Sequence, residues 1–150
     1  MRTISAKTFG FGVLIGLGLM ALTGCSGGGR TVKGQLQTGG QPYRVAEREQ
    51  ASILLVKEGN STTEGITGKI EPDGSFHFPK PVPDGPYKVL VTHTGDYTEF
   101  LKQKPGARKA TGPPDKLKGA FTEQKSPLRI DITRSTSLVV DLQAKTITKK

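Results

Sequence analysis

The chain is poor in the residues that build catalytic and metal sites. Its 150 residues contain one cysteine, two histidines and no tryptophan. A single cysteine cannot close an internal disulfide. The sequence holds no His-Glu-x-x-His, no paired cysteines and no Gly-x-Ser-x-Gly elbow, which argues against zinc and serine-hydrolase sites. We therefore predict no catalytic residue, no metal and no cofactor.

Long helical periodicity is also missing, and this points to β-structure. No long segment repeats apolar residues at i, i+3, i+4 and i+7. Short β-branched runs instead alternate with Gly, Pro, Asp and Asn. They predict an all-β fold, an antiparallel β-sandwich of about seven strands in residues 31–142. The expected strands are residues 31–38, 52–56, 64–70, 76–78, 87–93, 128–132 and 138–142. The best hairpin surrounds Asp73-Gly74.

The N-terminal segment has the parts of a secretory signal. Arg2 and Lys7 give a positive start, and residues 9–22 form an apolar, glycine-containing run. That run has about 14 residues, short of the roughly 20 that a membrane-spanning helix needs. We expect residues 1–24 to be a helical signal peptide that is removed.

Leu22, Thr23 and Gly24 before Cys25 resemble the lipobox of bacterial lipoproteins. The resemblance implies a diacylglycerol on the Cys25 sulfur, cleavage before this residue, and a fatty acyl chain such as palmitate on the new amino group. The alternative is an unmodified thiol behind a conventional signal. Because Ser26 rather than an acidic residue follows, analogy with bacterial sorting favours the outer membrane or cell surface over the inner membrane.

The net charge indicates which classes of partner the protein favours. The formal charge is +9, and loss of Arg2 and Lys7 with the signal leaves +7. A basic protein favours anionic surroundings, although the charge can also serve solubility alone. Because export separates the chain from nucleic acid, we expect the membrane as partner and no nucleic acid.

Four motifs follow one another along the predicted domain. They are Val32-x-Gly34-x-Leu36, Gly39-Gly40-Gln41-Pro42, Asp73-Gly74-Ser75-Phe76 and Pro83-Asp84-Gly85-Pro86-Tyr87. In this order they resemble the motifs of carboxypeptidase regulatory-like domains, and the resemblance covers most of residues 31–142. The resemblance implies a transthyretin-like Greek-key sandwich that folds, docks or binds without catalysis. Transthyretin-like hydrolases of hydroxyisourate end in Tyr-Arg-Gly-Ser, which this chain lacks, so a hydrolase is the weaker alternative.

A long basic loop, residues 94–126, interrupts the predicted strands. Long inserts of this kind are usually functional or disordered. The cationic side chains that we single out are Lys102, Lys104, Arg108, Lys109, Lys116 and Lys118. We favour a solvated loop whose charges protect a sheet edge. The alternative is contact with anionic head groups or an envelope polymer. A flexible tether at residues 25–30 and a Lys-rich tail at residues 143–150 flank the domain.

The histidines and two aspartates have ordinary explanations. We expect His77 on the surface and His93 at a strand rim, bonded to backbone, with a joint role for His93 and Asp96 left open. Asp73 and Asp84 are conceivable calcium ligands, but both suit turns.

The function that these features favour is a lipid-anchored lipoprotein of the cell envelope, a non-catalytic structural or binding module. The alternative is an envelope assembly or chaperone-like protein that pairs through a sheet edge.

Overall fold

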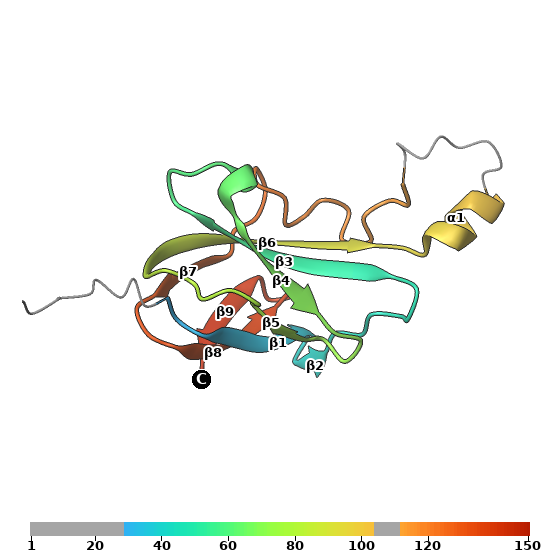
Figure 1. Ribbon diagram of the computed structural model, residues 1–150. Coiled ribbons are helices and arrows are strands. Elements are labelled where there is room, and N and C mark those ends of the chain that lie inside the picture. Colours follow the sequence, from blue (N-terminus) through green and yellow to red (C-terminus); the bar gives the residue numbers. More distant parts are fainter. Residues whose placement is uncertain (1–28, 104–111) are drawn as a thin grey trace, which may run out of the picture.

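A computed structural model describes residues 29–103 and 112–150, and its regular structure is mostly β-strand (Figure 1). The elements are β1 (Val32–Thr38), β2 (Gln41–Pro42), β3 (Gln50–Lys57), the 3-10 helix η1 (Thr62–Glu64), β4 (Ile66–Ile70), β5 (Ser75–His77), β6 (Gly85–Thr94), α1 (Tyr97–Gln103), β7 (Arg129–Ile132), β8 (Thr136–Asp141) and β9 (Thr146–Lys149). The predicted all-β class is confirmed.

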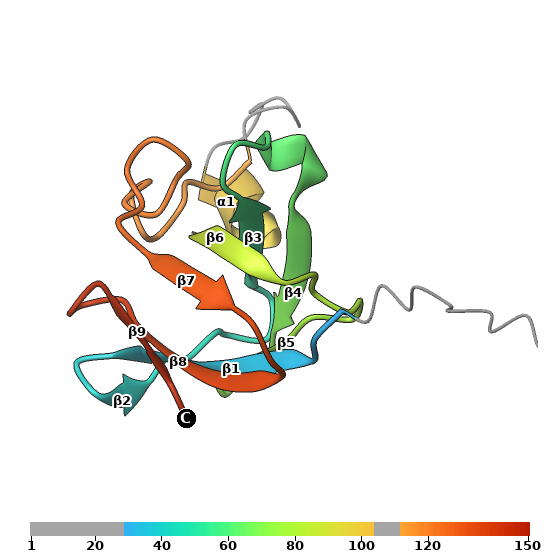
Figure 2. The ribbon, with the colours of Figure 1, turned by 90° about the vertical axis from the view of Figure 1, so that its left-hand side faces the viewer.

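The strands form one hydrogen-bonded sheet that curls over itself. Its order is β7-β6-β3-β4-β5-β1-β8-β9, with β2 paired to β1. The β7-β6-β3-β4 part faces the β5-β1-β8-β9 part, so the molecule has two layers, as in a sandwich or an incompletely closed barrel (Figure 2). The β4–β5 hairpin joins the layers.

Alternating side chains from both layers fill the core. Leu36 of β1, Ile53 and Leu55 of β3, Val89 of β6 and Val140 of β8 are fully buried. In a strand, every second side chain points to the same face, so the positions in β1, β6 and β8 follow from the alternation in the sequence. The expected inward positions of these three strands are thus confirmed. β3 does not alternate, because residues 53–56 are all apolar.

The hairpin predicted at Asp73-Gly74 connects β4 to β5. The Ser75 N–H donates to Oδ1 of Asp73 at 2.9 Å, and Gly74 has a φ of 84°. A left-handed φ strains residues with a Cβ, so glycine suits this turn. Beyond it, Phe76 and Phe78 are buried and His77 is exposed, as expected.

The direction of one strand pair differs from the prediction. β1 and β8 run parallel, in register from Val32 opposite Thr136 to Gln37 opposite Asp141. The alternating sequence pattern predicts antiparallel pairing throughout. Alternation determines which face of a strand is buried but not the direction of its neighbour, and these two strands are far apart in sequence.

Further elements lie where irregular chain was expected. β9 occupies the Lys-rich tail, where Ile147 packs against the core. α1 lies inside the basic loop, and Asp96 caps it by accepting the N–H groups of Thr98 and Glu99 at 2.7 and 3.2 Å. A seven-residue helix is too short to show a clear apolar period. Within residues 29–103 and 112–150, no helix has the length and apolarity to cross a bilayer.

The described chain begins at one end of the molecule, and the basic loop begins at the opposite end. At the entry, Arg30 pairs with Val82 in a β-bridge, and its guanidinium binds both carboxylate oxygens of Asp84 at 2.7 and 2.8 Å. β6 runs away from this end and leads into α1 at the other end (Figure 1). The basic loop therefore starts far from the point where the tether joins the domain.

Candidate functional site

Ten residues are singled out from the sequence for lipidation or for contact with an anionic surface, and the described part of the chain includes three of them. The lipidation residue Cys25, the lipobox residues Leu22, Thr23 and Gly24, and the loop residues Lys104, Arg108 and Lys109 lie outside the described residues. Lys102 is on α1, whereas Lys116 and Lys118 belong to residues 112–128, here called the return segment.

β7 pairs with only the first part of β6, residues 85–88. The return segment covers the rest of this edge of β6. The Lys116 N–H donates to the His93 carbonyl at 2.7 Å, and the carbonyls of Phe121 and Leu128 accept the N–H groups of Val91 and Val89 at 3.3 and 3.1 Å. Phe121 and Leu128 are also buried in the core. The half of the loop that follows residue 111 is thus built into the fold and covers an edge that could otherwise pair with another chain.

Asp115 folds the beginning of the return segment. Its Oδ1 accepts the N–H groups of His93 and Leu117 at 3.0 and 3.1 Å, and its Oδ2 accepts the Gly119 N–H at 2.9 Å. One carboxylate therefore organises a turn and attaches it to β6.

A polar chain of four side chains, Tyr43-His93-Glu49-Lys116, lies where β6 ends. The Tyr43 hydroxyl is 2.6 Å from Nδ1 of His93, and Nε2 of His93 is 2.9 Å from Oε2 of Glu49. The other oxygen of Glu49 binds the Lys116 ammonium. His93 is 2% exposed, so the expected rim position is wrong, and its ring contacts side chains rather than backbone. Asp96, which caps α1, contributes to the helix instead of to this chain.

The proton positions follow from these contacts. Burial raises the pKa of Tyr43, and the nearby carboxylates of Glu49 and Asp115 raise it further. The Lys116 ammonium lowers the pKa of Glu49, with help from the Ala46 N–H and the His93 ring. In the arrangement that matches these partners, the protonated phenol donates to Nδ1, and the Nε2–H donates to the carboxylate.

This protonation pattern suits a structural role. A tyrosine that acts as a nucleophile or base needs a lowered pKa, whereas that of Tyr43 is raised. His93 has both ring nitrogens engaged and is buried. The polar chain therefore ties the segment after β2, the start of β3 and the return segment to the end of β6.

The cations of the loop are partly neutralised. Lys116 binds Glu49, and Nζ of Lys102 lies 3.9 Å from Glu99. Lys118 is exposed and has a φ of 53°. The Glu49 partner could not be predicted because it lies 67 residues before Lys116, and nothing local in the sequence connects the two.

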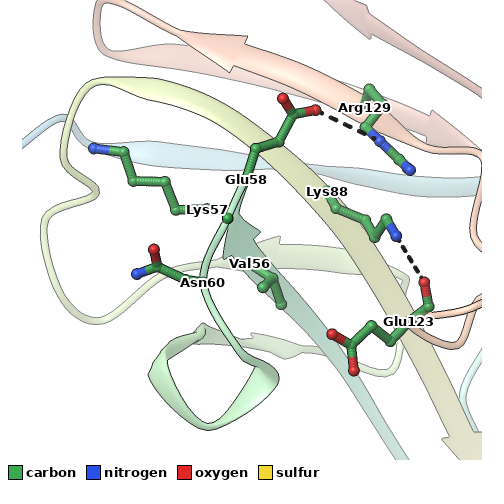
Figure 3. A pocket seen from close by; sticks show the side chains of 8 residues that line it. Val56, Lys57, Glu58, Asn60, Lys88, Glu123 and Arg129 are labelled. Carbon is green, nitrogen blue, oxygen red and sulfur yellow. Dashed lines mark hydrogen bonds and ion pairs between the residues drawn. The ribbon is translucent and has the colours of Figure 1, made fainter.

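A depression of about 250 Å³ lies between the β3–η1 loop, β6 and β7 (Figure 3). Its lining residues are Val56, Lys57, Glu58, Gly59, Asn60, Lys88, Glu123 and Arg129. Lys88 donates to the Glu123 carbonyl at 2.7 Å, and Arg129 lies 3.7 Å from Glu58 (Figure 3). Two of its three cations are thus engaged within the protein, so the depression presents no clear charge of one sign.

A second depression, of about 280 Å³, lies on the outer face of β3, β4 and β6. It is lined by Ser52, Leu54, Thr62, Thr67, Leu90, Thr92, Phe121, Thr122 and Glu123. Its surface is mostly apolar with a rim of hydroxyl groups, which suits packing more than chemistry.

The aspartates considered for calcium have partners of their own. The Ser75 hydroxyl and N–H lower the pKa of Asp73, and the Arg30 guanidinium lowers that of Asp84. Among the residues that the structure describes, no three His, Cys, Asp or Glu side chains gather closely enough to hold a metal ion.

Comparisons of the chain with protein-family models, with curated proteins and with solved structures find no match.

Proposed function

We propose that the chain is a lipoprotein of the bacterial cell envelope, in which lipid on Cys25 anchors a non-catalytic β-domain that acts as a structural or binding module. The observation that carries the proposal is the sequence Leu22-Thr23-Gly24-Cys25, placed directly after an apolar run and containing the sole cysteine. Each acyl CH₂ buried in a bilayer contributes about 0.8 kcal/mol, so several chains hold a protein almost permanently.

The position of the fold relative to Cys25 supports a close tether. Among the described residues, the first with a β-bridge is Arg30, the fifth residue after Cys25. At no more than about 3.6 Å per residue, this tether spans about 18 Å at most. The entry end of the domain then remains close to the membrane.

The polar chain supports the non-catalytic part of the proposal. Its groups bind one another, and the raised pKa of Tyr43 opposes activation of the phenol. The all-β fold is also compatible with the carboxypeptidase regulatory-like resemblance, which we retain as part of the proposal. A hydrolase of the transthyretin-like type has no comparable support.

Metabolic labelling with a fatty-acid probe tests the anchor. Wild-type protein should carry the label and sediment with membranes, whereas Cys25→Ala should lose both. Ser26→Ala is the matched control, because it changes the neighbouring residue and leaves the sulfur, and it should behave as wild type. A Cys25→Ala protein that stays in the membrane fraction to the wild-type extent would contradict the proposal.

The proposed location is the outer membrane or cell surface. Its support is Ser26, which is not acidic. Separation of inner and outer membranes should place wild-type protein in the outer fraction and move Ser26→Asp to the inner one. Equal distribution of the two proteins would remove this part of the proposal.

Pairing through a sheet edge is the second candidate. The strand order ends at β7 and β9, each of which pairs with one strand of the sheet. β9 is the more accessible end because Thr146, Thr148 and Lys149 are exposed. A photo-crosslinker at Thr148 should then capture a partner in intact cells, while one at the exposed Thr63 of η1 should not. Equal capture from both positions would exclude an edge-specific contact.

A further inference from the structure

A row of basic side chains runs from the end of β4 onto the outer face of the β5-β1-β8-β9 layer. Lys69 of β4 stands opposite His77 of β5, and His77 stands opposite Lys33 of β1. Lys33 stands opposite Ser137 of β8, whose carbonyl accepts the N–H of Lys150 at 2.8 Å. Directly opposed residues share a face of the sheet. We call these five residues, four basic side chains and one serine, the basic row; from His77 to Lys150 it spans about 14 Å, because adjacent strands lie roughly 4.8 Å apart.

A depression adjoins Lys33, Ser137 and Lys150 of the row. Its volume is about 270 Å³, and its lining is Thr31, Lys33, Ser135, Thr136, Ser137 and Lys150. The Thr136 hydroxyl donates to the Ser137 carbonyl at 3.4 Å. Two ammonium groups and the other three hydroxyl groups offer hydrogen-bond donors, as phosphate oxygens require. Oγ of Ser135 accepts the Thr31 N–H at 3.1 Å, which leaves its own O–H able to donate outward.

Charge on this face is concentrated in the row. No carboxylate in the described part of the chain pairs with Lys33 or Lys150, whereas Lys69 is 2.9 Å from Glu71. The acid of the same layer, Asp141, lies at the far end of β8 and accepts the N–H groups of Gly39 and Gly40, among others. The positive end of the face is therefore the end where β1 begins.

That end is also where the chain enters the domain. Lys33 is three residues after Arg30, and Arg30 is within the reach of the tether derived above. The described cations of the loop lie at the other end of β6, and two of them are paired with carboxylates. A surface that meets the membrane beside the anchor would thus be the basic row rather than the loop.

We propose that the depression between Lys33 and Lys150 binds the phosphates of anionic phospholipids and docks the outer face of β1 and β8 on the membrane. This inference rests on the proposed lipid anchor, which brings the row to the bilayer. Attraction of basic residues to anionic lipids is electrostatic, so salt weakens it.

The test uses the lipidated full-length protein in vesicles of phosphatidylcholine, with or without phosphatidylglycerol. A water-soluble amine reagent and mass spectrometry report how fast each lysine is modified. In the anionic vesicles, modification of Lys33, Lys69 and Lys150 should slow several-fold, while that of Lys102 and Lys118 should not. Salt at 1 M, where the screening length is about 3 Å, should abolish the difference. Equal slowing at all five positions, or at none, would overturn the docking face.

Two variants of equal charge change compare the row with the loop. Lys33→Glu/Lys150→Glu should remove the protection of Lys69, and Lys102→Glu/Lys118→Glu should leave it intact. The reverse result would assign the contact to the loop and refute the proposal. Protection by inorganic phosphate with neutral vesicles, equal to that with phosphatidylglycerol, would indicate a site for soluble phosphate and would also refute membrane docking.

Flotation separates this proposal from the anchor. Lipidated protein should float with neutral vesicles whether or not the row functions. If the protein does not float with neutral vesicles, the anchor proposal fails. The basic row is then tested by whether the protein floats with anionic vesicles at low salt and not at high salt. Absence of that flotation would refute the row as well.

Discussion

The hydroxyl of Tyr43 lies 2.6 Å from Nδ1 of His93, and the two rings meet edge to face with centroids 5.4 Å apart. Tyr43 follows β2 and His93 is near the end of β6, so this contact joins the two layers at one end of the core. It places a polar pair where the apolar core ends.

Tyr43→Phe should destabilise the domain. The substitution keeps the ring contact but leaves Nδ1 of a buried histidine without its partner, which costs about 1–3 kcal/mol. Urea unfolding followed by circular dichroism measures the loss. Tyr97→Phe on α1 is the control: no hydrogen bond joins its hydroxyl to the rest of the described chain, and it should change stability by less than about 0.5 kcal/mol. Equal effects of the two substitutions would show that the Tyr43–His93 bond contributes nothing.

Stability should fall in acid, in part because of Glu49. Its pKa is lowered in the folded state, so the folded protein binds fewer protons than the unfolded chain below the ordinary carboxyl value of about 4.3. The contribution is complete above that value and is lost as pH falls through the lower, folded-state pKa.

Glu49→Gln should therefore flatten the acid side of a plot of melting temperature against pH. Asp73, Asp84 and Asp141 also have lowered pKa values, so some acid dependence should remain. Glu64→Gln removes a carboxylate from an exposed position and should reproduce the wild-type slope. If Glu49→Gln gives that slope too, the Glu49–Lys116 pair does not stabilise the fold.

Gly34→Ala should be strongly destabilising. A Cβ at this position would lie 2.5 Å from Cζ of Phe76 and closer still to the carbonyl oxygen of Leu138. Overpacking of this kind typically costs about 1–3 kcal/mol. At Gly95 the nearest atom would be 3.7 Å away, so Gly95→Ala should be nearly neutral. Chemical denaturation of both variants measures the contrast, and a neutral Gly34→Ala would mean that β1 and β5 are further apart than described.

Phe121→Ala should loosen the return segment as well as the core. Truncation of a buried phenylalanine costs about 3–5 kcal/mol. It should also raise hydrogen exchange at Val91, whose N–H donates to the Phe121 carbonyl. Leu101→Ala on α1, at an exposed position, is the control and should alter neither quantity. Wild-type exchange at Val91 in Phe121→Ala would show that the segment does not depend on this anchor.

Local patterns predicted much of the core. Val32 and Leu36, Phe76 and Phe78, and the alternation of β6 were assigned to the correct face, and the Asp73-Gly74 hairpin forms as expected. Each follows from a period of two or from turn chemistry, which operate within a few residues.

Long-range partners were not predictable in the same way. The parallel β1–β8 pair, the Lys116–Glu49 ion pair and the burial of His93 all depend on which distant segments meet. His93 continues the inward alternation of β6, which was a signal for burial, but its position near the strand end suggested a rim. The basic row could not be predicted either, because it requires the register of four strands.

The parallel pairing of β1 with β8 also determines when the fold can close. Val32 stands opposite Thr136, which follows it by 104 residues. Until β8 binds, one side of β1 has backbone groups without a strand to bind. Closing so long a loop is entropically slow, so we expect the pairing of β1 with β8 to be a late step in completing the core.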